Sequence, residues 1–145
     1  MPAFDEEAFQ QWSKRKLDQA VEELIQYKVF DTPAIQARVV WGITDNVLLA
    51  QVQEGGHGRD FRWLITGEDY PTDHVPASVA KQPRLAARHF SLKWQLGAER
   101  VQDLPPGARA NIDPKYDLKE MSEALSSQAM RLYDLVENDA LWPKT

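Results

Sequence analysis

The sequence predicts an α+β fold in which one N-terminal helix, a three-stranded antiparallel meander and two C-terminal helices follow one another, in the order α-β-β-β-α-α. Three observations support this prediction. Apolar residues recur at helical spacing near both ends of the chain, they alternate with a two-residue period in the middle, and short turn sequences separate the alternating segments. The length of 145 residues suits a single domain, residues 1–145, with a core of its own.

The first predicted element is an amphipathic helix of about twenty residues. Asp5-Glu6-Glu7 places negative charge where a helix N-terminus favours it. We expect Asp31-Thr32-Pro33 to end the helix, because proline disfavours helical geometry in the residue before it. The apolar face consists of Phe9, Trp12, Leu17, Ala20, Val21 and Leu24.

Three strands are predicted next, at Ile35 to Ile43, Val47 to Gln53 and Arg59 to Thr66. Their connections are short, so neighbouring strands are antiparallel and the second is central. The connection Gly55-Gly56-His57-Gly58 resembles a phosphate-binding loop, but such loops lead into a helix N-terminus. Because this one leads into a strand, we interpret it as a hairpin connection.

The turn after the first strand predicts the strand register. A two-residue loop, Asp45-Asn46, places Thr44 opposite Val47 and, further along, Trp41 opposite Ala50. Trp63 on the third strand should flank the same alanine. The face that we expect to form the core then consists of Val39, Trp41, Ile43, Leu48, Ala50, Val52, Phe61, Trp63 and Ile65.

The opposite face of the predicted sheet carries an apolar patch, which we interpret as a surface for self-association or for a partner protein. Its polar neighbours include Arg38, Gln51, Gln53 and Arg62. The patch itself consists of Val40, Val47, Leu49 and Leu64.

Two helices are predicted in the C-terminal half. Residues 67–76 form a loop, Pro83 suits the first turn of a helix that extends to Leu104, and residues 105–116 form a second loop. Asp117, followed three residues later by Glu120, resembles a capping box that begins the last helix. Leu141 and Trp142 are expected to fold back on the body of the protein.

The sequence contains a few candidates for chemistry in this half. Asp69, Asp73 and His74 are typical metal-ligand types, but the pattern lacks a helical ligand pair, and turns and helix caps are the favoured interpretation. His89 has the spacing of the Leu85, Leu92 and Leu96 face, so we expect a buried core histidine rather than a general base. We therefore predict no catalytic residue and no metal site.

A basic ridge lies at the start of the first C-terminal helix. Lys81, Arg84 and Arg88 follow one another at three- and four-residue steps. Such a ridge is a candidate for binding an anion, either a phosphate or a partner's carboxylate, and a solvated helix face is the simpler interpretation.

Composition excludes several classes of function. Seventeen Lys and Arg against 22 Asp and Glu give a net charge of −5, which disfavours a nucleic-acid or anionic-membrane binder. The absence of cysteine excludes disulfides and thiolate chemistry and fits a reducing compartment. No apolar run is long enough to span a bilayer, and the acidic N-terminus has no features of a secretory signal, so we expect a cytoplasmic protein. We also expect no cofactor.

Three stretches of the sequence resemble a known family. They are Trp63–Gly67 followed by Pro71–Asp73, Arg88–Glu99, and Leu132–Asn138 with Leu141-Trp142. Together they are similar to a proteobacterial family of short single-domain proteins that is described only as a domain of unknown function. The resemblance covers nearly the whole chain, implies a stand-alone bacterial cytosolic protein, and transfers no catalytic residue.

These observations favour a non-enzymatic module that binds another protein or a second copy of itself. A narrower version is an immunity or adaptor protein, in which the acidic chain neutralises a basic partner. The alternative is a small-molecule-binding protein or enzyme with a site near the loop after the third strand, formed by Asp73, His74, Arg84 and Arg88. A deep pocket would favour the alternative, and a flat apolar patch the binding module.

Overall fold

The computed structural model describes residues 5–30, 34–55, 60–104 and 117–143. The chain divides into two compact units, Met1–Ala86 and Ala87–Thr145, and each is described by itself. The single-domain organisation remains a prediction. No helix in the described ranges combines the length and the apolar character that crossing a membrane requires.

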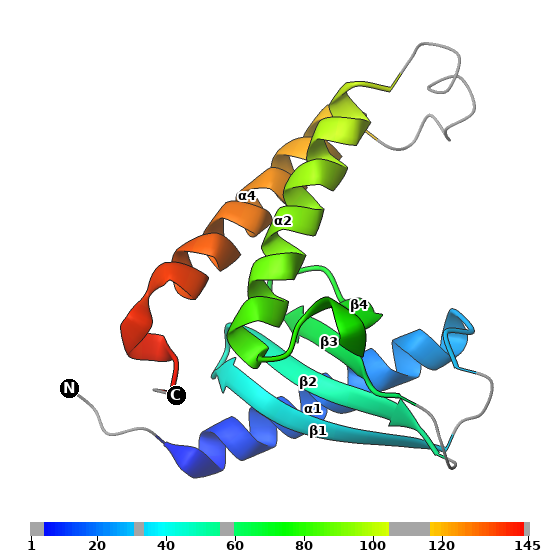
Figure 1. Cartoon of the computed structure of the whole chain (residues 1–145), viewed down its shortest axis with the longest axis vertical. Helices are drawn as coiled ribbons and strands as arrows, with labels where there is room; N and C mark the ends of the chain where they lie inside the picture. The colour runs from blue at the N-terminus through cyan, green and yellow to red at the C-terminus, as the bar shows by residue number, and fades with distance from the viewer. Residues whose placement is uncertain (1–4, 31–33, 56–59, 105–116, 144–145) are drawn as a thin grey trace. The chain divides into compact units, whose positions relative to one another are not determined.

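The first unit contains one long helix and one antiparallel sheet, which confirms the α+β class (Figure 1). The sheet has four strands in the order β1-β2-β3-β4, where three were predicted. The added strand lies within the predicted loop of residues 67–76 and is only four residues long, too short to show a two-residue period in the sequence. The elements are α1 (Glu6–Gln26), β1 (Ile35–Ile43), β2 (Val47–Glu54), β3 (Arg62–Gly67), β4 (Asp73–Pro76) and the 3₁₀ turn η1 (Ala77–Val79).

Helix α1 begins as predicted and ends earlier than predicted. The Asp5 carboxylate accepts a hydrogen bond from the Ala8 amide at 3.0 Å, which caps the N-terminus. At the other end Lys28 adopts a left-handed conformation with φ of 59°, and the Val29 amide donates to the Leu24 carbonyl at 3.0 Å. This is a Schellman motif, so α1 ends at its own C-cap and not at Asp31-Thr32-Pro33.

The predicted register of the first two strands is wrong. Ile43, not Thr44, pairs with Val47, because the loop has three residues and Asp45 within it has a left-handed φ of 60°. The same loop places Trp41 opposite Leu49, and a bulge between Val39 and Trp41 then shifts the pairing, so that Val39 lies opposite Ala50.

The two sheet faces therefore differ from the predicted ones. Leu64, not Trp63, lies opposite Ala50, so Leu64 belongs to the face that packs on α1. Trp63 points to the other face, where its indole N–H donates to the Ala80 carbonyl at 3.1 Å. The core between α1 and the sheet consists of Trp12, Leu17, Ala20, Leu24, Leu48, Ala50, Val52 and Leu64.

The second unit is mainly a pair of antiparallel helices, α2 (Pro83–Gln102), which starts in the first unit, and α4 (Leu118–Glu137), followed by the 3₁₀ turn η2 (Asp139–Leu141). Figure 1 shows α2 and α4 side by side, and the buried Ser122 hydroxyl donates to the Ala98 carbonyl at 2.9 Å between them. Asp117 caps α4 as predicted by accepting from the amide of Glu120 at 3.2 Å.

The C-terminal segment also follows the prediction. Trp142 is 6% exposed, and its indole N–H donates to the Leu135 carbonyl at 3.0 Å. The aromatic side chain thus folds back on the end of α4.

The buried face of α2 is not the predicted one. Leu85, Leu92 and Leu96 are 43–53% exposed, and His89 on the same stripe is only partly buried. The interpretation of His89 as a core histidine is therefore wrong. Both sides of this helix carry apolar residues, so periodicity alone does not select between them; the buried side consists of Ala86, Ala87, Phe90, Trp94 and Ala98.

Candidate functional site

The two outer strands of the sheet differ in how well their edges are protected. β4 is four residues long and ends at Pro76, and both shortness and proline discourage the addition of a further strand. β1 has nine residues without proline, and no other described strand pairs with its outer edge (Figure 1). Gln36, Ala37 and Arg38 are all exposed, which is the longest exposed run within these four strands.

One hydrogen bond shows which backbone groups of β1 face outward. The Gly55 amide donates to the Ala34 carbonyl, so this pair is a hydrogen-bonded pair of the antiparallel ladder. Such pairs alternate along a ladder, so Gln36 and Arg38 direct their backbone groups toward β2. The amides and carbonyls of the intervening residues, Ile35, Ala37 and Val39, consequently point toward the open edge.

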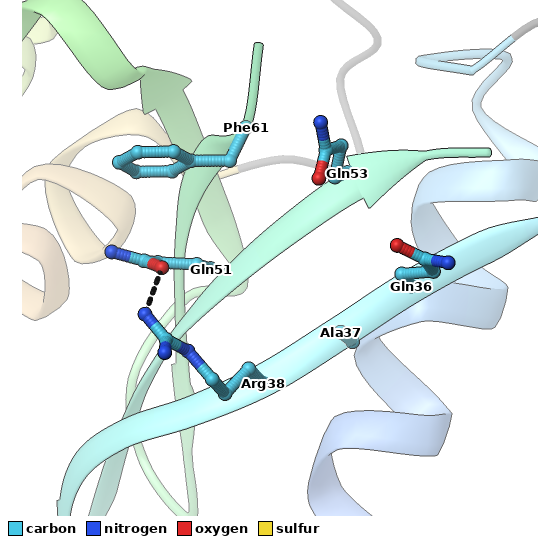
Figure 2. Close-up of a pocket in the computed structure, with 6 residues that line it drawn as sticks. All are labelled: Gln36, Ala37, Arg38, Gln51, Gln53 and Phe61. Carbon is cyan, nitrogen blue, oxygen red and sulfur yellow. Dashed lines mark hydrogen bonds between the residues drawn. The ribbon is translucent and has the colours of Figure 1, made fainter. Parts of the chain in front are cut away.

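A hollow of about 340 Å³ lies on the sheet face that carries Gln36 and Arg38. We call it the amide hollow, because three glutamines line it (Figure 2). Its full lining is Gln36, Ala37, Arg38, Gln51, Gln53 and Phe61.

The side chains of the amide hollow are held by local contacts. An Arg38 terminal N–H donates to Gln51 Oε1 at 2.6 Å across the strand pair, and Figure 2 shows Gln51 between Arg38 and the Phe61 ring. Phe61 packs edge-on against Trp63 with ring centroids 5.1 Å apart. The hollow thus offers amide and guanidinium groups beside one aromatic ring.

A second hollow, of about 510 Å³, lies on the other face at the same edge, between α1 and β1. We call it the α1 groove. Its apolar lining consists of Leu17, Val21, Ile25, Ile35 and Ala37, and its charged lining of Lys14, Asp18 and Glu22. Ala37 lines both hollows, so the open edge has a polar hollow on one side and a largely apolar one on the other.

This arrangement suits the binding of an extended polypeptide. A strand that pairs with an open edge gains main-chain hydrogen bonds, while its alternate side chains point to opposite faces of the sheet. The two hollows that Ala37 lines are on these two faces, so each can receive side chains from one side of the added strand.

A family model described as "Domain of unknown function (DUF4826)" matches residues 6–142, almost the entire chain. The chain belongs to the DUF4826 family. Comparisons with curated proteins and with solved structures give no match.

The partner patch predicted for this DUF4826 member does not form one exposed surface. Val47, Leu49 and Leu64 are each 0% exposed. Leu64 lies on the α1 face, whereas Leu49 pairs with Trp41 and Ile65. Val40 is at the bulge and half-buried. The prediction that these four side chains share one exposed sheet face is therefore wrong.

Two of the three residues of the predicted basic ridge, Arg84 and Arg88, lie in α2. Lys81 precedes α2 and is exposed, Arg84 is half-buried in the first turn, and Arg88 is exposed one turn later. Anion binding by these residues remains a prediction.

Two members of the predicted alternative site are direct neighbours, and the assembly of the whole site remains a prediction. Asp73 and His74 are neighbours in β4, where the Asp73 carboxylate accepts from the His74 amide at 2.8 Å. His74 Nδ1 accepts from Arg62 Nε at 2.9 Å, so Arg62, which was not among the predicted site residues, lies against this histidine. Among the described residues, no group of three or more His, Cys, Asp or Glu is arranged to hold a metal ion.

A separate polar cluster ties α1 to the turn after β3. The Trp12 indole N–H donates to Glu68 Oε1 at 2.6 Å, and Lys16 Nζ lies 3.5 Å from Glu68 Oε2. The hydrogen bond from Trp12 is the main cause that lowers the pKa of Glu68 below 4.5, with the charges of Lys16 and Arg15 acting in the same direction against some desolvation. This cluster fixes α1 on the sheet and lies outside both hollows.

The sequence did not predict this site, although it predicted that some of the residues of the site share one sheet face. Arg38, Gln51 and Gln53 were placed together as polar residues on one face, and the structure keeps them together. The available signal was a nine-residue edge strand without proline. The predicted meander already made the first strand an edge, but it made the third strand the other edge; the pairing of β4 with β3 leaves β1 as the long open edge.

Proposed function

We propose that this DUF4826 protein is an interaction module that binds an extended polypeptide strand along the edge of β1. The observation that carries the proposal is the open edge of residues 35–39 with a hollow on each side of Ala37. We place the module in the bacterial cytosol as part of the same proposal, since a chain without cysteine suits a reducing compartment.

The chemistry of the edge supports a strand as the ligand. The outward N–H and C=O groups of an open sheet edge form a template for a further strand, and an extended peptide supplies partners for both in the correct spacing. Side chains on one face of the added strand would contact the apolar α1 groove, and those on the other the amide hollow. We therefore expect bound peptides to alternate between aliphatic and hydrogen-bonding side chains.

Proline at position 37 is a sharp test. The Ala37 amide points away from β2, so Ala37→Pro removes a donor from the open edge and none from the β1–β2 ladder. Ala37→Ser, which retains the amide and changes the side chain little, is the matched control.

The measurement uses linear peptides selected from a displayed random library on the wild-type chain. We expect these peptides to bind wild type and Ala37→Ser with similar affinity and Ala37→Pro at least tenfold more weakly, a loss of about 1.4 kcal/mol. Hydrogen exchange should slow at the amides of residues 35, 37 and 39. Selected peptides that bind Ala37→Pro as well as wild type, or that protect other amides instead, would contradict the proposal.

A further inference from the structure

The edge of β1 is self-complementary when it is paired with its own copy. We infer that the strand recognised at this edge is β1 of a second chain, paired antiparallel around a two-fold axis at Ala37. This inference rests on the proposed function and names its partner.

The straight part of the strand has the symmetry that such a pair needs. Regular pairing with β2 extends from Ile35 to Val39, where the bulge begins, and Ala37 is its middle residue. A bulge limits how far a flat partner strand can continue, so the usable edge is these five residues. The exposed run of residues 36–38 is centred on the same alanine.

The side chains match across that axis. Reversing the strand places Ile35 opposite Val39 of the second copy, which is an apolar pair, and Gln36 opposite Arg38, which is an amide–guanidinium pair. No two like charges oppose each other. Arg38 donates one terminal N–H to Gln51 and has further N–H groups for a second amide.

The alternation of outward-facing backbone groups along β1 also suits this pairing. Ile35, Ala37 and Val39 direct their N–H and C=O groups outward, so the pair at the axis and the two pairs beside it are hydrogen-bonded pairs. This gives about six main-chain hydrogen bonds between the copies. The Gln36–Arg38 pairs then occupy the closer, non-hydrogen-bonded positions, where side chains interact best.

The small side chain at the axis and the adjoining groove favour close approach. Two Ala37 side chains oppose each other on the α1 side of the sheet without obstruction, since each is a single methyl group. A second copy would also cover part of the α1 groove, including Val21 and Ile25. The contact is one short strand pair, so we expect a weak dimer at the low end of interface size.

The first experiment is sedimentation velocity of the full chain over a wide concentration range. We expect a reversible monomer–dimer equilibrium that Ala37→Ser retains and Ala37→Pro weakens at least tenfold. Circular dichroism of each variant checks that the fold is unchanged. A wild-type chain that is monomeric at every concentration, or an Ala37→Pro chain that dimerises like wild type, overturns the inference.

A second measurement tests the register even if proline disturbs the strand. The chain has no cysteine, so Ala37→Cys creates a single thiol. At a two-fold axis the two Cα atoms of a hydrogen-bonded pair are about 5.5 Å apart, within disulfide range, so mild oxidation should cross-link this variant. Asp45→Cys, in the exposed loop at the end of β1, should not cross-link, and equal cross-linking of both variants overturns the inference.

The same samples separate this inference from the proposed function. A monomeric wild type that still binds library peptides, with loss in Ala37→Pro, overturns the second copy as partner and leaves strand binding intact. A chain that neither dimerises nor binds peptides through residues 35–39 overturns both.

Discussion

A matched pair of glycine-to-alanine substitutions tests the close backbone approach at the end of β3. A Cβ added to Gly67 would clash with the Asn46 carbonyl oxygen and lie 3.1 Å from Val47 Cα, and both are main-chain atoms that cannot rotate away. The Glu68 amide donates to the same oxygen at 2.9 Å. Gly67→Ala must therefore separate the β1–β2 turn from the end of β3.

The expected cost follows from two contributions. Overpacking of a tight site costs about 1–3 kcal/mol, and loss of the Glu68 amide bond about 1 kcal/mol, so we expect Gly67→Ala to lower the free energy of unfolding by about 2–4 kcal/mol. For a chain of this size that lowers the melting temperature by about 5–15 °C. Circular dichroism during thermal and urea unfolding measures both quantities.

Gly97→Ala is the control, with the opposite sign. The added Cβ would lie 3.2 Å from Leu125 Cδ2, the end of a side chain that can rotate, and alanine favours the helix by about 0.5–1 kcal/mol. We expect an unchanged or slightly raised stability. A Gly67→Ala variant within about 0.5 kcal/mol of wild type, which is the usual range for a harmless surface change, would refute the steric argument.

Two further predictions concern α1. Lys28 has φ of 59° at the Schellman position, so Lys28→Gly should raise the free energy of unfolding by about 0.5–1 kcal/mol in urea titrations, whereas Lys28→Ala, which retains a Cβ, should not; equal effects would contradict the strain. The Trp12 hydrogen bond lowers the pKa of Glu68, so Trp12→Phe should raise that pKa toward 4.5 in an NMR titration. Because the folded pKa is the lower one, the stabilising contribution of Glu68 is present above about pH 4.5 and is lost as the pH falls through the folded pKa, a loss that Glu68→Gln should not show.

Local signals in the sequence were sufficient for the helix starts and for the class of fold. Asp5 and Asp117 cap α1 and α4 through bonds to amides two or three residues away, so the information lies within one helical turn. The two-residue alternation likewise located three of the four strands, because a half-buried strand needs that period wherever it lies in the fold.

The end of α1 was local too, but its signal was hidden. The left-handed position just after the C-cap is commonly glycine, and here it is Lys28, while a conspicuous proline stands further along at position 33. The proline therefore predicted the wrong C-terminal boundary for α1.

The candidate site was decided by tertiary structure. The bulge between Val39 and Trp41 shifts the ladder by one residue, and a shift of one residue sends side chains to the opposite face of a sheet. Four-residue β4 exists because β3 offers it a partner, and its pairing covers one edge of the sheet and leaves β1 as the long open one.

The sequence by itself therefore determined what each segment becomes, because capping and alternation act between near neighbours in the chain. Only pairing between distant segments decided which residues of β1 face α1. The same pairing decided which backbone groups remain without a described partner strand. The register of that pairing decides which strand side chains pack against α1, and no local pattern around Ala37 contains that information.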